Sequence, residues 1–166
     1  MKHLIACLVI VVLSVICCAV CADETPAVPE ELQQEIHLDD MTLSLTLSWI
    51  PKELSEEDTA NGIQFWAETS ENTKSLMLNF SGNGDSASVM ELATVNDYAG
   101  IATRVNTESY NGIDFVLAVN EENHSVYAYF SISDSIYTIS FLTHEDIDLE
   151  EMQNELLQIC STITPN

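Results

Sequence analysis

The residues Gly82-Asn83-Gly84-Asp85-Ser86-Ala87 have the spacing GxGxxA. Dinucleotide-binding turns use this spacing to hold a pyrophosphate, within a parallel strand-helix-strand unit and with an acidic residue about 20 positions further on. Glu108 lies near that distance, but the flanking strands are expected to be antiparallel, and the acidity of the chain disfavours a bound pyrophosphate. A tight turn followed by a helix start is the preferred interpretation, and no cofactor is predicted.

Alternating carboxylates at Asp146-Ile147-Asp148-Leu149-Glu150-Glu151 resemble the first positions of a calcium-binding loop. The EF-hand loop requires glycine at its sixth position and glutamate at its twelfth, where this chain has Glu151 and Leu157. Asp146 and Asp148 are better explained as acids at the start of a helix, where the helix dipole favours negative charge. No metal ligand is assigned, and a weak calcium site stays open as an alternative.

Zinc chemistry and nucleophilic catalysis have no matching pattern. His37, His124 and His144 show neither HxxxH spacing nor a neighbouring cysteine pair, as a zinc site would require. Cys160 follows Ile159 on the predicted apolar side of the last helix, where a lone cysteine packs as a small hydrophobic side chain. The chain contains no GxSxG nucleophile elbow. No catalytic residue is assigned, but a small secreted hydrolase with a carboxylate pair assembled from distant residues is an alternative.

The charge of the chain limits its partners. Its 166 residues include 27 Asp and Glu against four Lys and Arg, for a net charge of −23. This field repels phosphate backbones and anionic lipid headgroups, so we expect neither nucleic-acid binding nor peripheral membrane binding by charge. Solubility outside the cell would explain the charge, and a basic protein surface is the more specific alternative. The candidate partner-binding residues are the acids of two predicted loops: Glu56, Glu57, Asp58, Glu121 and Glu122.

Residues 1–22 have the three parts of a secretory signal peptide: a basic start at Lys2, an apolar run from Leu4 to Val20 and a small-residue exit at Ala22. The apolar run is at the lower limit for a membrane span, which takes about 17 to 25 residues, so an uncleaved N-terminal anchor is an alternative. We therefore expect a secreted or extracytoplasmic protein of the cell envelope.

Four of the five cysteines lie in this signal segment. Cys18 and Cys21 invite comparison with the lipid-bearing cysteine of a bacterial lipobox, but neither follows a small residue. A lipid anchor is a further alternative for the N-terminus. If residues 1–22 are removed, Cys160 is the only cysteine left, and the mature chain cannot form an internal disulfide.

Residues 23–40 are interpreted as an acidic tether with prolines, and residues 41–166 as one domain. Met41, Leu43, Leu45 and Leu47 alternate with polar residues, which predicts a half-buried strand that Pro51 ends. By apolar periodicity the remaining elements are strands at 62–67, 75–80, 113–119, 125–131 and 135–141, with helices at 86–98 and 148–163.

Two other features of this domain are interpreted as structural. Residues 52–61 are expected to be a solvated loop. The aromatic residues of the strands are expected to pack within the sheet, although they could also line a ligand groove: Trp49, Trp66, Tyr127, Tyr129 and Tyr137.

The element order βββαβββα predicts an α+β domain, an antiparallel six-stranded sheet with helices packed on it. This order resembles the PsbP-like (Mog-type) fold over about Met41 to Ile163. The segments that carry the resemblance are MTLSLTLSW, GIDFVLAV–SVYAYFS–SIYTISF and DLEEMQNELLQICSTI. That superfamily includes exported bacterial proteins of the DcrB-like kind, photosystem assembly subunits and a Ran-binding protein. The resemblance implies a binding or assembly role without catalysis, and it supplies no site residues.

The sequence therefore predicts an exported, acidic, non-enzymatic binding or assembly module of the cell exterior or envelope. Two alternatives stay open. One is the small secreted hydrolase, and the other is an inhibitor-like protein that masks a basic partner.

Overall fold

The computed structural model of the chain describes residues 33–143 and 148–166. The predicted signal peptide, residues 23–32 of the tether, and the candidate ligands His144 and Asp146 lie outside these ranges. The strands are β1 (Gln33–His37), β2 (Met41–Thr46), β3 (Trp49–Pro51), β4 (Ile63–Thr69), β5 (Lys74–Asn83), β6 (Thr103–Tyr110), β7 (Ile113–Asn120), β8 (Ser125–Ile132), β9 (Ser135–Thr143) and β10 (Thr164–Pro165). The helices are α2 (Glu56–Ala60), α3 (Ser86–Tyr98) and α4 (Leu149–Thr162).

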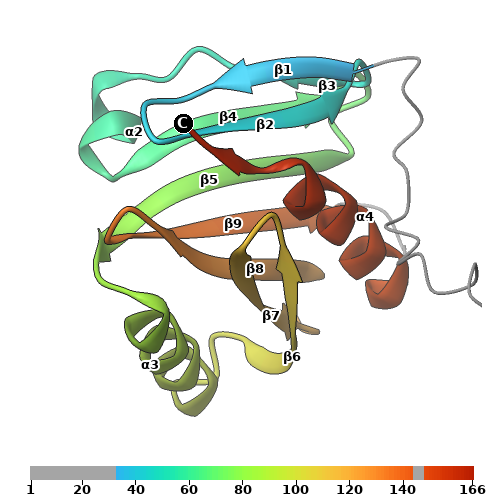
Figure 1. The fold of residues 1–166 in the computed structure, drawn as a ribbon. Coiled ribbons are helices and arrows are strands. Elements are labelled where there is room, and N and C mark those ends of the chain that lie inside the picture. The colour runs from blue at the N-terminus through green and yellow to red at the C-terminus, as the bar shows by residue number, and fades with distance from the viewer. Residues whose placement is uncertain (1–32, 144–147) are drawn as a thin grey trace, which may run out of the picture.

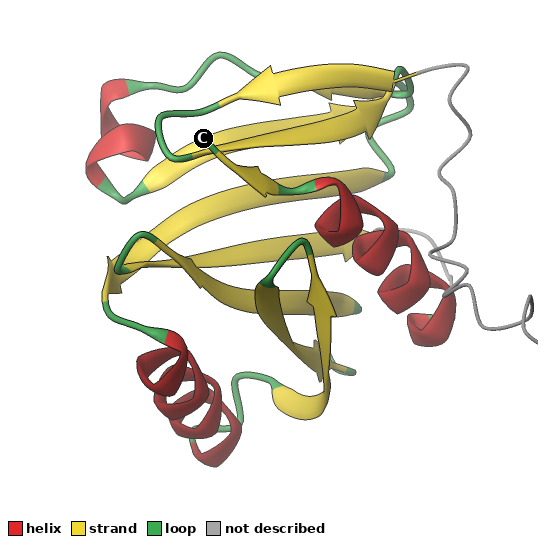
Figure 2. Cartoon of the chain, viewed as in Figure 1, coloured by secondary structure: helices red, strands yellow, loops and turns green. Residues whose placement is uncertain are grey.

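The described strands form two sheets (Figures 1 and 2). The large sheet has seven strands in the order β3-β4-β5-β9-β8-β7-β6, and each neighbouring pair is antiparallel. The small sheet has three strands in the order β1-β2-β10. The last residues of the chain thus pair with one of its first described strands.

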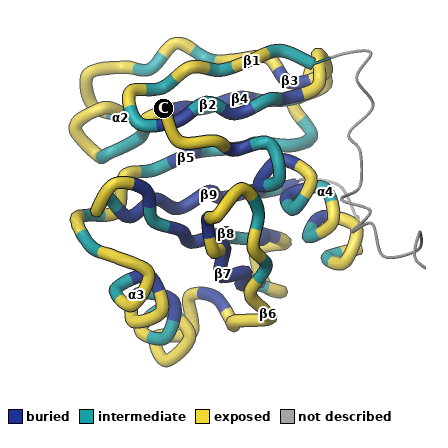
Figure 3. The backbone as a smooth tube through the Cα atoms, viewed as in Figure 1, coloured by how far each residue is buried: buried dark blue, intermediate teal, exposed yellow. Residues whose placement is uncertain are grey.

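Side chains that alternate along the central strands face two different layers. Phe130 of β8 belongs to the main core, which the small sheet and α4 cover, whereas its neighbour Tyr129 faces α3 on the other side. Val89 and Ala93 are the α3 residues buried on that second face. Figure 3 shows the buried segments concentrated in the central strands, with the outer side of α3 exposed. The main core contains Met41, Leu43 and Leu45 of β2, Phe115 of β7, Phe141 of β9, and Met152 and Leu156 of α4.

The α+β class with a mainly antiparallel sheet is confirmed, but a six-stranded sheet in the order βββαβββα is wrong. The large sheet has seven strands, and a second sheet of three strands lies against it. β6 was missed because Thr103–Thr107 are all exposed at the sheet edge and show no apolar alternation. β1 forms from residues 33–37, in the segment interpreted as a tether, and pairs with β2 along its whole length.

The strand expected from Met41 to Pro51 is two strands in different sheets. A turn at Leu47 and Ser48 separates β2 from β3, and Leu47 is 56% exposed although it continues the apolar alternation. The turn directs Trp49 into the core, where its ring lies edge-on to Phe141 at 5.7 Å. Burial of this large side chain outweighs exposure of the leucine.

The expected loop at 52–61 contains the short helix α2. Ser55 caps it: its Oγ accepts from the backbone N–H of Asp58 at 3.1 Å, and the Asp58 carboxylate accepts from the backbone N–H of Ser55 at 2.9 Å. None of the α2 residues is buried. This capping box explains a helix that apolar periodicity could not predict.

Asn111 and Gly112 form the turn between β6 and β7, with φ values of 52° and 78°. Two successive positive φ values suit the tight turns that join antiparallel strands. The Asn111 side-chain amide also donates to the carbonyl oxygens of Ser161 and Ile163, both at 2.9 Å. Asn111 therefore links the β6–β7 hairpin to the end of α4.

Two replacements of Asn111 separate the contribution of its side-chain hydrogen bonds from that of its positive φ. We expect Asn111→Gly to lose the two hydrogen bonds and about 1 kcal/mol of unfolding free energy. Asn111→Ala should lose about 2 kcal/mol, because alanine also resists a positive φ. Urea denaturation of both variants measures the difference, and equal losses would contradict a contribution from the backbone conformation.

Candidate functional site

The five predicted partner-binding acids lie at opposite ends of the large sheet. α2 precedes Ile63 of β4, which is in register with Asn79 of β5. The β7–β8 turn follows Asn120. The paired positions on the neighbouring strands lead from Asn120 through Leu142 to Ser75 of β5. Asn79 and Ser75 are about 13 Å apart along β5, at about 3.3 Å per residue. The two acidic groups lie further out still, one beyond each of these positions. α2 carries Glu56, Glu57 and Asp58, and the β7–β8 turn carries Glu121 and Glu122.

Glu121 and Glu122 border a groove of about 270 Å³, which we call the α3–β6 groove. Its lining residues are Gly100, Ile101, Ala102, Thr103, Val119, Asn120, Glu121 and Glu122. Asn120 connects its two sides: Nδ2 donates to the Ile101 carbonyl at 2.6 Å, and Oδ1 accepts from the Asn123 backbone N–H at 2.9 Å. The acidic turn and the segment between α3 and β6 are thus held in one arrangement.

Apolar side chains are exposed beside these acids. Ile101 is 49% exposed, and Tyr98, three residues earlier at the end of α3, is 89% exposed. Val95, one helical turn before Tyr98, is also exposed. Exposed aromatic and apolar residues next to charged ones are typical of protein interfaces. Sequence reasoning identified the two acids and missed Tyr98, because a helical pattern alone does not show which face is covered.

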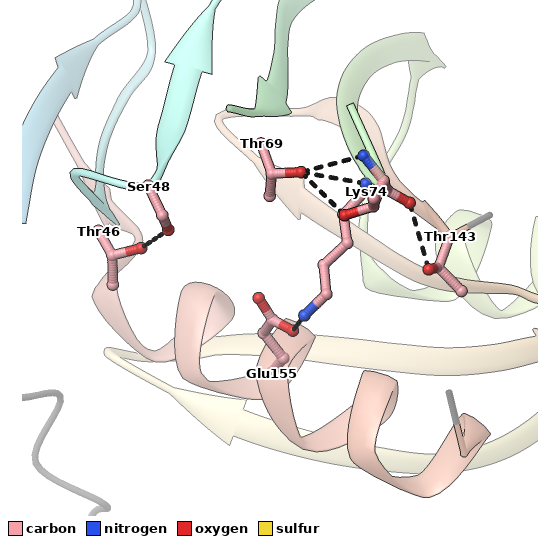
Figure 4. A network of polar contacts seen from close by, with 7 residues as sticks. Thr46, Ser48, Thr69, Lys74, Thr143 and Glu155 are labelled. Atoms are coloured by element: carbon pink, nitrogen blue, oxygen red, sulfur yellow. Dashed lines mark hydrogen bonds and ion pairs between the residues drawn. The ribbon is translucent and has the colours of Figure 1, made fainter. Parts of the chain in front are cut away.

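A second groove of about 310 Å³ lies between β2 and α4. At its border Lys74 Nζ contacts Glu155 Oε2 at 2.6 Å, and the same ammonium group lies 5.8 Å from the ring centroid of Phe141. Figure 4 shows this pair beside the β4–β5 turn, where Thr69 Oγ1 accepts from the backbone N–H of Lys74 at 3.2 Å. The Thr143 hydroxyl donates to the Thr73 carbonyl at 3.3 Å. The contacts join α4 to the large sheet, so we interpret this network as structural.

Few positive charges offset the acids on the described surface. Lys52 pairs with Glu68 at 2.7 Å and Lys74 pairs with Glu155. Arg104 is exposed on the edge strand β6. Both lysines are therefore already neutralised by carboxylates, and the outward field is negative.

A third cavity, of about 290 Å³, is named here the Tyr137 pocket. It is lined by Leu38, Asp39, Asp40, Met41, Gln64, Phe80, Ser135 and Tyr137. The Tyr137 hydroxyl donates a short hydrogen bond to Asp40 Oδ2. Burial, the hydrogen bond to Asp40 and the charge of that carboxylate together raise the pKa of Tyr137 to about 12.

The raised pKa of Tyr137 makes stability depend on alkaline pH. Ionisation of the unfolded tyrosine near its ordinary pKa of 10.0 precedes ionisation of the folded one near 12, so the free energy of unfolding should fall between these values. Tyr137→Phe should make the free energy of unfolding fall less steeply with pH in this range. Urea denaturation at several pH values from about 9 to about 11 provides the measurement. Parallel profiles for the two proteins would contradict the assignment.

The hydrolase alternative called for a buried carboxylate pair with a raised pKa. Within residues 33–143 and 148–166 the buried polar side chains are hydroxyls, of Ser125, Thr138, Ser140 and Thr143. The same residues contain no group of three His, Cys, Asp or Glu side chains that could hold a metal. Hydrogen bonds from Ser55 and Ser88 lower the pKa values of Asp58 and Asp85, opposite to the direction of a general acid. This alternative gains no support.

The GxGxxA segment forms the expected turn and helix start. Asp85 caps α3, accepting from the backbone N–H of Ser88 at 3.1 Å, and the preceding strand β5 is antiparallel to both its neighbours. A Cβ atom on Gly84 would lie 2.5 Å from the Ser88 Cβ and 2.8 Å from the Ile136 Cδ1. The glycine is therefore explained by close packing without a nucleotide.

The strand aromatics pack within the sheet, and two of them also border cavities. Tyr127 and Tyr129 stack with ring centroids 6.3 Å apart, and Trp66 donates to the Ser75 hydroxyl at 3.1 Å, as expected for sheet packing. Trp49 and Tyr137 also line cavities. For these two residues the ligand-groove alternative stays a prediction.

Cys160 is buried in the main core and belongs to α4. Burial raises the pKa of its thiol well above the usual range, which disfavours the reactive thiolate. Its α4 neighbours Met152, Leu156 and Ile159 are buried with it. The interpretation of Cys160 as a small hydrophobic core residue is confirmed.

Alkylation should distinguish this buried thiol from a nucleophile. We expect iodoacetamide to leave Cys160 unmodified in the native protein and to modify it in urea, because both access and ionisation require unfolding. Mass spectrometry of the protease fragment containing Cys160 gives the readout. Rapid labelling of the native protein would contradict the core assignment.

None of the helices in the described ranges is long and apolar enough to cross a membrane. Neither protein-family models nor curated protein sequences match the chain. Among solved structures it is similar to the solution structure of cyanobacterial PsbP (CyanoP) from Synechocystis sp. PCC 6803, with a TM-score of 0.57 and 12% sequence identity. The similarity covers 89% of this chain and 99% of that chain. At this identity the likeness concerns the fold alone, and the protein has a PsbP-like fold.

Proposed function

We propose that this protein is an exported, non-enzymatic binding or assembly module that contacts a basic protein partner through the α3–β6 groove. The observation that carries the proposal is exposed apolar surface at the groove: Ile101 lines it together with Glu121 and Glu122 and is 49% exposed. Tyr98, two residues before the lining residue Gly100, is 89% exposed. An exposed tyrosine supplies a large contact area at a small entropic cost, and tyrosine is enriched among residues that dominate binding energy.

The acids around the groove define the chemistry of the partner. Glu121 and Glu122 are exposed in a turn that Asn120 holds in place. Carboxylates in this position favour a partner that surrounds an apolar patch with Lys or Arg, because complementary charge accelerates association and excludes wrong partners. Exposed charges contribute little affinity by themselves, so the apolar residues Tyr98 and Ile101 would supply most of it.

The other acidic group is a weaker candidate for the contact. Glu56 and Glu57 lie on a helix with no buried residue, and its charges are in part used in its own capping. The extracytoplasmic location is supported by the signal-like residues 1–22. The PsbP-like fold agrees with the binding role that the sequence resemblance implies, although a fold does not by itself define a function.

Affinity capture in the producing cell tests the proposal. The full chain, with a tag attached through a flexible linker after Asn166, is cross-linked in the envelope and culture fluid, and its partners are identified. We expect one basic protein, released by salt. Tyr98→Ala should weaken its binding by about tenfold or more, as for a central interface residue.

Charge variants provide a matched comparison between the two ends of the sheet. Glu121→Gln with Glu122→Gln should weaken binding about two- to fivefold and reduce its salt dependence. Glu56→Gln with Glu57→Gln removes the same charge on α2 and should have no effect. Equal losses in both pairs would refute the α3–β6 groove, and an empty capture at low salt would refute a stable protein partner. A captured enzyme that loses activity would identify the inhibitor-like alternative.

A further inference from the structure

The Tyr137 pocket combines aromatic walls with uncompensated carboxylates. Phe80 is 38% exposed and its ring lies edge-on to Tyr137, with centroids 6.1 Å apart. Asp39 and Asp40 border the same cavity, and the negative charges of both act on the Tyr137 hydroxyl. Neither acid has a basic partner among the described residues, because the ion pairs there involve Glu35, Glu68 and Glu155.

The turn that carries the two acids is held in position by residue 166. The Asn166 side-chain amide donates to the Leu38 carbonyl at 2.6 Å and to the Asp39 carbonyl at 3.2 Å. The Asn166 backbone N–H donates to the Asp40 carbonyl at 3.1 Å, and Tyr137 holds the Asp40 side chain. The turn between β1 and β2 is therefore fixed before any ligand arrives, which lowers the entropic cost of binding.

Asp39 has a carboxylate that is available to a ligand. In the described part of the chain its side chain makes no hydrogen bond or ion pair, and the hydrogen bond from Asn166 goes to its backbone carbonyl. Gln64 and Ser135 add an amide and a hydroxyl to the same wall. The pocket thus offers two negative charges, neutral acceptors and the face or edge of an aromatic ring.

We propose that the Tyr137 pocket binds a side-chain-sized organic cation, a guanidinium or a primary alkylammonium group. A carboxylate beside an aromatic ring is the combination that attracts such cations, because the ring face is electronegative and the alkyl stem packs on apolar atoms. The volume of about 290 Å³ is at the small end of ligand pockets, which suits a single side chain.

Other ligand classes fit less well. An anion would face Asp39 and Asp40 with no positive group among the lining residues. A metal ion usually requires more oxygen ligands than two neighbouring carboxylates provide, and the described residues contain no cluster of three metal-binding side chains. The aromatic wall would contribute nothing to an inorganic ion of this kind.

This site is separate from the α3–β6 groove. Phe80 pairs with Tyr137 near the β8–β9 turn, whereas Glu121 and Glu122 occupy the β7–β8 turn at the other end of the same strands. The inference therefore does not depend on the proposed protein partner, and either one can fail without the other.

Titration of the ¹⁵N-labelled protein with small probes at low salt tests the inference. The probes are ethylguanidinium and n-butylammonium, with ethylurea and n-butanol as neutral isosteres and CaCl₂ as the inorganic cation. We expect saturable chemical-shift changes at Gln64, Phe80 and Asp39 with the two organic cations only. A short peptide containing one arginine then separates the sources: tighter binding than ethylguanidinium points to a partner's side chain, and equal or weaker binding points to a free small cation.

Variants connect the binding to the named groups. Asp39→Asn should weaken ethylguanidinium binding about two- to fivefold, the range for an exposed charge pair. Phe80→Leu keeps an apolar side chain, removes the ring and should also weaken binding about two- to fivefold. Asp97→Asn removes the same charge from the surface of α3 and is the matched control.

Three results would overturn the inference. They are the absence of saturable shifts with either organic cation, equal shifts with the neutral isosteres, and shifts at the same residues with CaCl₂ alone. Unchanged affinity in both Asp39→Asn and Phe80→Leu would also overturn it, because the cation would then bind elsewhere. Folding of each variant is checked by its amide spectrum, and both substituted side chains are exposed to solvent.

Discussion

The structure depends on how one apolar face of a seven-stranded sheet is covered. Phe115, Phe130 and Phe141 project from three strands of the large sheet into the main core. No single element covers them: the β2 strand of the small sheet and α4 share the task. Because burial of apolar surface is the main driving force of folding, β2 and α4 must lie side by side over this face. They do so where the Thr162 hydroxyl, at the end of α4, accepts from the backbone N–H of Ser44 at 2.9 Å.

The extent of successful prediction follows from how much each element contributes to that core. β7, β8, β9 and α4 lie close to their expected positions because they are rich in buried apolar residues. α3 also matches its expected range, although only Val89 and Ala93 of it are buried. β6 was missed because an edge strand is paired on one side only, and its exposed residues lack the alternation. One signal was available there: Asn111-Gly112 is the dipeptide most strongly associated with a tight turn between antiparallel strands. β10 spans only two residues, too few for any periodic pattern.

The candidate sites were harder to predict than the fold. Glu121 and Glu122 could be named from charge, but charge alone did not distinguish them from Glu56 and Glu57. The distinction depends on the exposure of Tyr98 and Ile101, which is decided by how α3 and the segment after it pack on the sheet. Of the Tyr137 pocket, only Tyr137 was named from the sequence, as one of five aromatics that could line a groove. The pocket is assembled from four segments that are far apart in the sequence: 38–41, 64, 80 and 135–137.

The contacts of the C-terminal residue have a consequence for biosynthesis. Asn166 contacts Leu38 across 128 positions, and β10 pairs with β2. Closing so long a loop is entropically costly, and the small sheet cannot be completed until residues 164–166 have been synthesised. Since synthesis adds about 5–20 residues per second, the nascent chain remains without this closure while residues 47–163 are added. All seven strands of the large sheet are synthesised before β10, so the small sheet is the last part of the described fold to close.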